Sequence, residues 1–174
     1  MSEKHTEPWL NYAALTTILF AVCATLSSFK EGGYSTDSLS CQTQISDQWA
    51  HYQSKSIKFY LYELQIDNLQ SELDDLKDSS SAGKIQKRIA DYKAKTAQYI
   101  KDKEQIKKEA DKLEVSRKDS SLRDRAFGIA VIFLQISILL SSISVLMKKK
   151  FVWYIGMGVG LFGLFYFTNG FFLF

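Results

Sequence analysis

The stretch that decides the fold lies at the end of the chain and reads "AFGIAVIFLQISILLSSISVLM" (126–147), "KKK" (148–150) and "FVWYIGMGVGLFGLFYFTNGFFLF" (151–174). Neither long segment contains Asp, Glu, Lys, Arg or His. Each exceeds the roughly 20 residues that a helix needs to cross the ~30 Å hydrocarbon core of a bilayer. Because backbone groups in lipid must pair internally, we expect both segments to be transmembrane helices.

A third apolar run, "LNYAALTTILFAVCATLSSF" (10–29), lies near the start of the chain and is also free of charged residues. It is longer than the apolar core of a typical signal peptide, and the nine residues before it are not clearly basic. We therefore predict a retained signal anchor rather than a cleaved leader. Trp9, Trp153 and Tyr154 lie at the ends of the runs, where aromatic rings favour the headgroup level of a membrane.

Nearly all the charge is concentrated in residues 30–125, between the first two apolar runs. This segment holds 18 Lys and Arg against 17 Asp and Glu, so its net charge almost cancels. Nucleic-acid binding favours a net basic stripe, so we expect no nucleic-acid partner. Pairs in the favourable i, i+4 order, such as Glu104 and Lys108, are typical of a solvated helix.

The polar segment also shows heptad spacing, which predicts a coiled coil. Apolar residues step by threes and fours on both sides of "KDSSSAGK" (77–84), a stretch typical of a turn, and no proline follows Pro8. We predict an antiparallel helical hairpin with its turn at about 78–83, a register that sets Trp49 opposite Leu113. The predicted seam consists of Trp49, Tyr52, Leu69, Leu73, Ile89, Tyr92, Ile106 and Leu113.

These segments together predict an all-α membrane protein with three transmembrane helices and an extended antiparallel coiled-coil hairpin between spans 1 and 2. The expected order is an N-terminal tail (1–9), transmembrane helix 1 (10–29), the helical hairpin (30–125), transmembrane helix 2 (126–147) and transmembrane helix 3 (151–174). A seam only two residues wide leaves aromatic surface uncovered on the hairpin. We therefore expect a homo-oligomer.

Small and polar residues in the last two runs predict a packing or oligomer face. Gly156 and Gly160 have G-x-x-x-G spacing with Gly163 nearby, and such a face lets helix backbones approach closely in lipid. Gln135 lies close to the middle of its run and needs a polar partner there. The sequence leaves open whether this face packs inside one chain or between copies.

The one stretch that resembles a catalytic motif is "SDQWAHYQSKSIK" (46–58), in which Asp47, His51 and Ser54 share one helix face. Their order imitates a hydrolase triad. Side chains on one helix face do not converge on a substrate, however, and no oxyanion-hole glycine accompanies them. We therefore interpret them as solvent-facing or inter-subunit polar contacts and expect no enzyme.

Metal and disulfide chemistry are equally unsupported by the sequence. His5 and His51 are the only histidines, and the acidic residues are scattered among lysines, so we expect no metal and no cofactor. Cys23 and Cys41 are too few for a disulfide framework or a zinc ribbon. Two outcomes stay open for Cys41: a cross-link between two copies, or a small buried thiol.

Two blocks of sequence carry a family resemblance: residues 46–58 and "FLQISILLSSISVLMKKKFVWYIGMGVGLFG" (133–163). Over nearly its whole length the chain resembles the bacterial domain-of-unknown-function family 4337. Family members typically carry Ala, Tyr and Ala where this chain has Ile45, His51 and Ser54, so the imitated triad departs from the family pattern. The resemblance implies the architecture and a bacterial inner membrane, without an activity.

Charge near the spans favours one orientation. The three lysines at 148–150 occupy a very short connection, which favours the cytoplasm and places the N-terminus there and the hairpin in the periplasm. Arg117, Lys118, Arg123 and Arg125 lie on the hairpin side and argue the opposite. Short loops count more than a 95-residue one, so we expect a periplasmic hairpin.

Two function classes remain from the sequence. The first is a non-enzymatic, self-associating membrane protein that contacts lipids and presents its hairpin as a scaffold or docking element for an unknown protein partner. The alternative is a small homo-oligomeric channel or an accessory subunit of a larger membrane complex. No ionisable residue lies in the spans, which disfavours a pump. Polar residues of span 2 around a shared axis would favour a pore, whereas burial within one chain would favour a scaffold.

Overall fold

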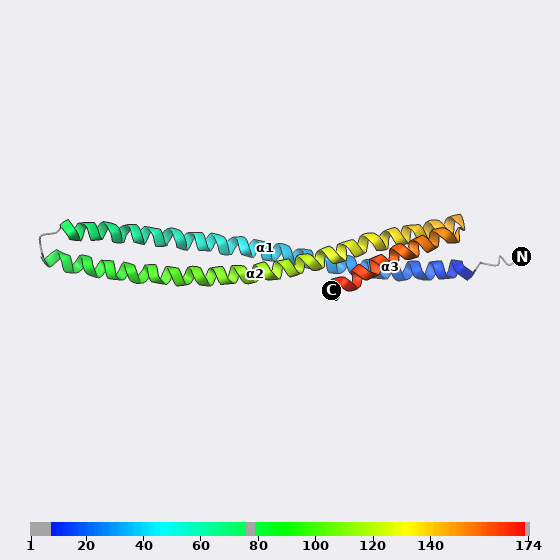
Figure 1. The fold of residues 1–174 in the computed structure, drawn as a ribbon, viewed down its shortest axis with the longest axis horizontal. Coiled ribbons are helices and arrows are strands. Elements are labelled where there is room, and N and C mark those ends of the chain that lie inside the picture. The colour runs from blue at the N-terminus through cyan, green and yellow to red at the C-terminus, as the bar shows by residue number, and fades with distance from the viewer. Residues whose placement is uncertain (1–7, 76–78, 173–174) are drawn as a thin grey trace, which may run out of the picture. The chain divides into compact units, whose positions relative to one another are not determined.

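The computed structural model describes residues 8–75 and 79–172, and within these ranges only Lys148 and Lys149 lie outside a helix. Helix α1 runs over Pro8–Asp75, α2 over Ser79–Met147 and α3 over Lys150–Phe172 (Figure 1). The prediction of an all-helical protein is thereby confirmed. Each helix contains a stretch long and apolar enough to cross a membrane.

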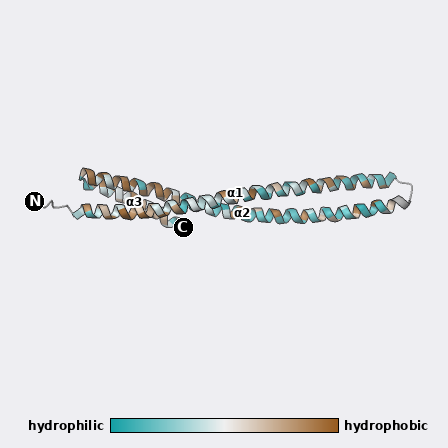
Figure 2. Ribbon diagram, turned by 180° about the vertical axis from the view of Figure 1, so that it is seen from behind, coloured by the Kyte–Doolittle hydropathy of each residue, from teal (hydrophilic) through white to brown (hydrophobic). Residues whose placement is uncertain are grey.

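The chain divides into two compact units. The three-helix unit comprises the residues up to Leu39 and those from Arg117 onward, and the two-helix unit comprises Ser40–Ser116. Hydrophobic residues gather on α3 and on the parts of α1 and α2 that pack with it, while the two-helix unit is mostly hydrophilic (Figure 2). The helices continue without a break through the ends of the apolar runs, at Phe29 and Ala126, so the three-helix unit extends past both.

In the two-helix unit, α1 and α2 lie antiparallel, and three polar contacts give their register. Gln48 Nε2 donates to Glu109 Oε2 at 3.4 Å, and Lys55 Nζ contacts Asp102 Oδ2 at 2.7 Å. Lys95 Nζ donates to Tyr62 Oη at 3.2 Å. Each contact is seven residues from the next on both helices, so the three contacts share one register.

The reversal between the two helices differs from the predicted turn at 78–83. Helix α2 already begins at Ser79, so residues 79–83 are helical, and the chain reverses between Asp75 and Ser79. Serine suits the first turn of a helix, and one glycine there costs only about 1 kcal/mol. The predicted turn residue Asp78 lies outside the described residues.

This earlier reversal shifts the register and corrects one predicted seam residue. Trp49, expected opposite Leu113, is 40% exposed and packs edge-on against Tyr52 of its own helix at 5.4 Å between ring centroids. Buried apolar residues in this part of the unit are instead Ile45 and Ala110.

The other predicted seam residues lie between the helices to differing degrees. Leu69, Ile89 and Ile106 are buried, while Tyr52, Leu73, Tyr92 and Leu113 are partly buried. Ile66, Leu69, Ile85 and Ile89 form one apolar cluster, with Leu73 and Tyr92 packed against it. A continuous but narrow apolar seam therefore holds this unit together.

The connection between α2 and α3 is a tight helix cap. Lys148 has a φ of 53°, and its N–H donates to Val145 O at 3.3 Å, while Lys149 N–H donates to Ser144 O at 3.1 Å. This is the hydrogen-bond pattern of a Schellman cap, which usually has glycine at the left-handed position. It reverses the chain within two residues, so α3 packs directly back on α2.

Candidate functional site

The glycine face of α3 is covered by the chain's own helices. Gly156, Gly160, Gly163 and Gly170 are all buried. A Cβ added at Gly163 would lie 2.8 Å from Leu134 Cγ and 3.0 Å from the Leu134 backbone nitrogen. At Gly160 an added Cβ would fall on the ring of Phe20 and 2.7 Å from Ser137 Oγ. The glycines therefore bring α3 against α1 and α2 of the same chain.

The serines of α2 lie inside the same three-helix unit. Ser137, Ser141 and Ser144 are fully buried. Ser137 Oγ donates to Gly156 O at 2.7 Å, and this hydrogen bond fixes α2 against α3 next to the glycine face. The Ser141 hydroxyl is buried without a hydrogen-bond partner among the described residues. These three serines of α2 are therefore buried by packing within one chain.

Gln135 lies on the other side of α2. Its side chain is exposed, although Leu134 beside it is fully buried. No hydrogen bond joins the Gln135 amide to another side chain in the described part of the chain. The structure therefore separates the two features that the sequence placed on one packing face: the glycines point inward and Gln135 points outward.

Arg123 caps the end of α3. Its guanidinium donates to Phe171 O at 3.0 Å and to Asp119 Oδ2 at 2.9 Å, and it lies 5.8 Å above the ring of Tyr34. The hydrogen bond to Asp119 raises the pKa of Arg123 above its already high ordinary value. Tyr34 in turn stacks on the buried ring of Phe127. This cluster locks all three helices at the border of the three-helix unit.

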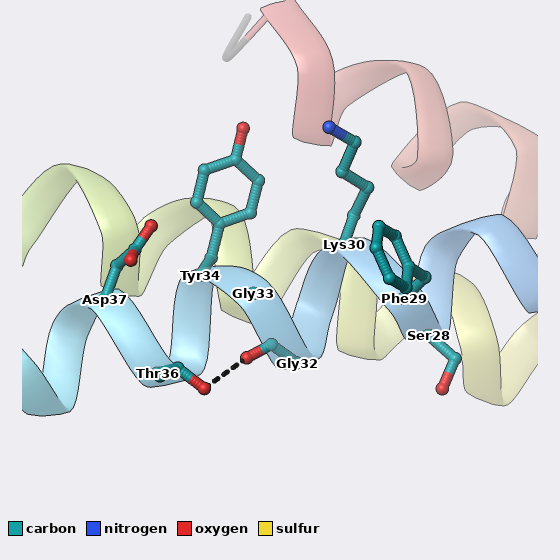
Figure 3. A pocket seen from close by; sticks show the side chains of 8 residues that line it. All are labelled: Ser28, Phe29, Lys30, Gly32, Gly33, Tyr34, Thr36 and Asp37. Atoms are coloured by element: carbon teal, nitrogen blue, oxygen red, sulfur yellow. Dashed lines mark hydrogen bonds between the residues drawn. The ribbon is translucent and has the colours of Figure 1, made fainter.

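A shallow groove on α1 lies near that border, where Gly32 and Gly33 carry no side chain (Figure 3). Lys30 and Tyr34 point to one side of it, while Thr36 points to the other and donates to Gly32 O at 2.8 Å. An added Cβ would meet nothing within 4 Å at either glycine. The residues that line this groove all belong to α1.

The imitated triad does not assemble into a site. Asp47, His51 and Ser54 are all exposed, and no hydrogen bond joins them. His51 instead borders a polar groove beside the ion pair of Lys55 and Asp102. Within the described ranges no group of three or more His, Cys, Asp and Glu side chains is placed to hold a metal ion.

Lysines interleave with aromatic rings across the two-helix unit. Lys103 Nζ lies 5.0 Å from the ring centroid of Tyr52 and 5.3 Å from that of Phe59, and Lys95 Nζ lies 5.1 Å from that of Tyr62. The hydrogen bond that Lys95 donates to Tyr62 Oη raises the pKa of Lys95. The Lys103 ammonium therefore lies over the aromatic faces of Tyr52 and Phe59, while its aliphatic stem is partly buried.

An apolar stripe on the outer side of α1 is the feature that sequence analysis missed. It consists of Ile57, Tyr60, Leu61 and Leu64, each 57–62% exposed. Their i, i+3, i+4, i+7 spacing places them on one helix face, opposite the seam. The spacing of the stripe residues could have been read from the sequence. It is hard to recognise there because Phe59 and Tyr62, which follow the seam pattern, are interleaved with the stripe residues.

Comparison with known proteins gives one match. A family model described as a domain of unknown function, DUF4337, matches residues 9–173, which is nearly the whole chain. This match confirms the resemblance noted in the sequence. No curated protein and no solved structure matches the chain.

Proposed function

The chain belongs to the DUF4337 family, and we propose that it is a non-enzymatic inner-membrane protein that presents a coiled-coil hairpin as a scaffold. In this proposal the three-helix unit spans the bilayer and the two-helix unit projects into the periplasm. The hairpin associates with further copies of the chain and docks a protein partner. The long apolar stretch within each of the three described helices supports the membrane assignment.

The apolar stripe is the observation that carries the docking role. The four side chains of the stripe are 57–62% exposed, so they would lie in water in an isolated hairpin. The Tyr60 ring also has Lys103 Nζ of α2 at 6.0 Å from its centroid. Contiguous apolar side chains rimmed by polar ones mark interaction surfaces. An amphipathic face with this spacing is also how helices recognise grooves and other helices.

The buried serines support a scaffold over a pore. A passive pore needs polar side chains around a water-filled axis. Ser137, Ser141 and Ser144 are instead fully buried between helices of a single chain. The spans also lack Asp, Glu, Lys, Arg and His, the side chains that usually mark ion pathways.

Membrane insertion and orientation are tested with the native cysteines. In a Cys23→Ser background, a membrane-impermeant maleimide applied to intact cells should label Cys41, and alkaline carbonate should leave the chain in the membrane pellet. Labelling only after lysis would place the hairpin in the cytoplasm. Release by carbonate would remove the membrane assignment.

The docking role is tested by photo-crosslinking in cells. A photoreactive residue at Leu61 should give discrete adducts with protein, whether another copy of the chain or a partner. The matched control is the same group at Lys108, which is also exposed on the two-helix unit but outside the stripe. Equal crosslinking at both positions, or none at Leu61, would refute the stripe as the docking surface.

A further inference from the structure

The outward amide of Gln135 is the starting point. It lies within the most apolar stretch of α2, and its side chain is exposed on the outside of the three-helix unit. The hydroxyls of Thr17, Thr25 and Ser142 in the same unit all donate to carbonyls of their own helices. Gln135 has no such partner in the described part of the chain.

The neighbours of Gln135 form a regular outward face. The Gln135 seam consists of Ile132, Gln135, Leu139, Ser142 and Leu146, all exposed. The steps between them are three, four, three and four residues, which is the heptad spacing of a helix–helix contact. Ser142 is small, so a second helix can approach closely there. Ser142 already donates to Ile138 O of its own helix, so the seam resembles one half of a helix pair in which Gln135 is the one polar side chain without a partner in the described residues.

Lipid makes the unpaired amide costly. Hydrocarbon offers no hydrogen-bond partner, so an amide near mid-bilayer is stabilised only by another polar group. Polar residues inside spans consequently act as contacts between helices. A single polar residue in a heptad seam also sets which partner and which register are accepted.

A second copy of the same chain supplies the matching group. All copies insert in the same orientation, so residue 135 lies at the same depth in each. A glutamine amide both donates and accepts hydrogen bonds, so two of them satisfy each other across a two-fold axis. A different partner would need its own polar residue at that depth.

We propose that α2 forms a parallel, two-fold contact with α2 of a second copy through the Gln135 seam, with the two Gln135 amides hydrogen-bonded to each other. This inference rests on the proposed membrane function and deepens it by naming the surface of self-association. It assigns contact between copies to the outer face of α2 and leaves the glycine face to packing within each chain.

Cysteine crosslinking tests the geometry in membranes. With Cys23 and Cys41 replaced by serine, Gln135→Cys and Leu139→Cys should each form a disulfide-linked dimer under a mild oxidant. Leu19→Cys and Leu161→Cys are the controls, because both side chains are exposed on the same unit but on other helices. Crosslinking at the controls without crosslinking at 135 and 139 would overturn the proposal.

An amide substitution tests the chemistry. In lipid vesicles containing two fluorescently distinguishable copies, Gln135→Leu should raise the dissociation constant of the dimer roughly 3- to 30-fold. Gln135→Asn keeps an amide and should retain most of the energy transfer. Leu161→Ala should match the wild type. Unchanged energy transfer in Gln135→Leu would show that the amide does not hold the copies together.

Two further readouts separate the possible failures. Alkaline extraction of each variant reports membrane insertion independently of dimerisation, so loss of the chain from the pellet would refute the membrane function itself. A photoreactive group at residue 135 should give adducts with a second copy. Adducts only with lipid, or with a different protein, would overturn the Gln135 seam while leaving the membrane function intact.

Discussion

The two units of this protein bring their helices together in different ways. The two-helix unit buries Ile66, Leu69, Ile85 and Ile89 between two helices. In the three-helix unit, every buried residue of α3 is a glycine, and the larger side chains of α1 and α2 fill the space that they leave.

The difference follows from the solvent in which each unit is proposed to fold. In water, burying large apolar side chains is itself the driving force, at about 25 cal/mol per Å². In lipid that force is absent between helices, and close backbone approach with interhelical hydrogen bonds replaces it. The glycines that α3 places against Phe20 and Leu134 are therefore typical of helix packing in lipid, the environment proposed for this unit.

The largest expected effect breaks the two-helix unit. Tyr99→Pro removes an i→i−4 hydrogen bond from the middle of α2 and forces the ring against the preceding turn, at a cost of about 3 kcal/mol or more. Thermal unfolding followed by circular dichroism should detect the loss, with Tyr99→Phe as the control that keeps the aromatic ring. Identical midpoints for the two variants would contradict the continuous helix over Ser79–Met147.

A steric substitution breaks the three-helix unit. Gly160→Ile places a branched side chain against Phe20 and Ser137, so we expect a loss of about 1–3 kcal/mol. Gly158→Ile is the matched control, because an added Cβ meets nothing within 4 Å there. Unfolding in detergent should give a lower free energy of unfolding for Gly160→Ile than for Gly158→Ile. Equal stability would show that the glycine face does not pack within the chain.

A smaller effect distinguishes two serines on the same face of α2. Ser137→Ala loses the 2.7 Å hydrogen bond to Gly156 O and should destabilise the three-helix unit by about 1 kcal/mol. Ser141→Ala removes a buried hydroxyl that has no hydrogen-bond partner, so it should be neutral or stabilising. The same unfolding assay measures both. A larger loss of stability in Ser141→Ala than in Ser137→Ala would show that the Ser141 hydroxyl, and not that of Ser137, makes the stabilising hydrogen bond.

The helices and the apolar runs were predictable because both leave a direct mark in the sequence. The helices show as apolar residues at steps of three and four, and the runs show as long stretches without charged residues. The register of the two-helix unit was not, because it depends on where the chain reverses, and Ser79–Gly83 suits a helix start as well as a turn. The outward direction of the Gln135 side chain could not be predicted from the sequence either. A single chain gives the order of side chains around α2, but only packing against α1 and α3 decides which side is covered.

The three-helix unit is proposed to lie in lipid and the two-helix unit in water, and a matched pair of leucines tests this difference most directly. Leu19 of the three-helix unit is 54% exposed and Leu61 of the two-helix unit is 57% exposed, so both point outward to nearly the same extent. Nitroxide labels at Leu19→Cys and Leu61→Cys, with the native cysteines replaced by serine, report collisions with oxygen and with a water-soluble nickel complex in lipid vesicles. We predict that the label at residue 19 meets oxygen far more often than nickel, and that the label at residue 61 shows the reverse. The same oxygen-to-nickel ratio at both positions would contradict the account.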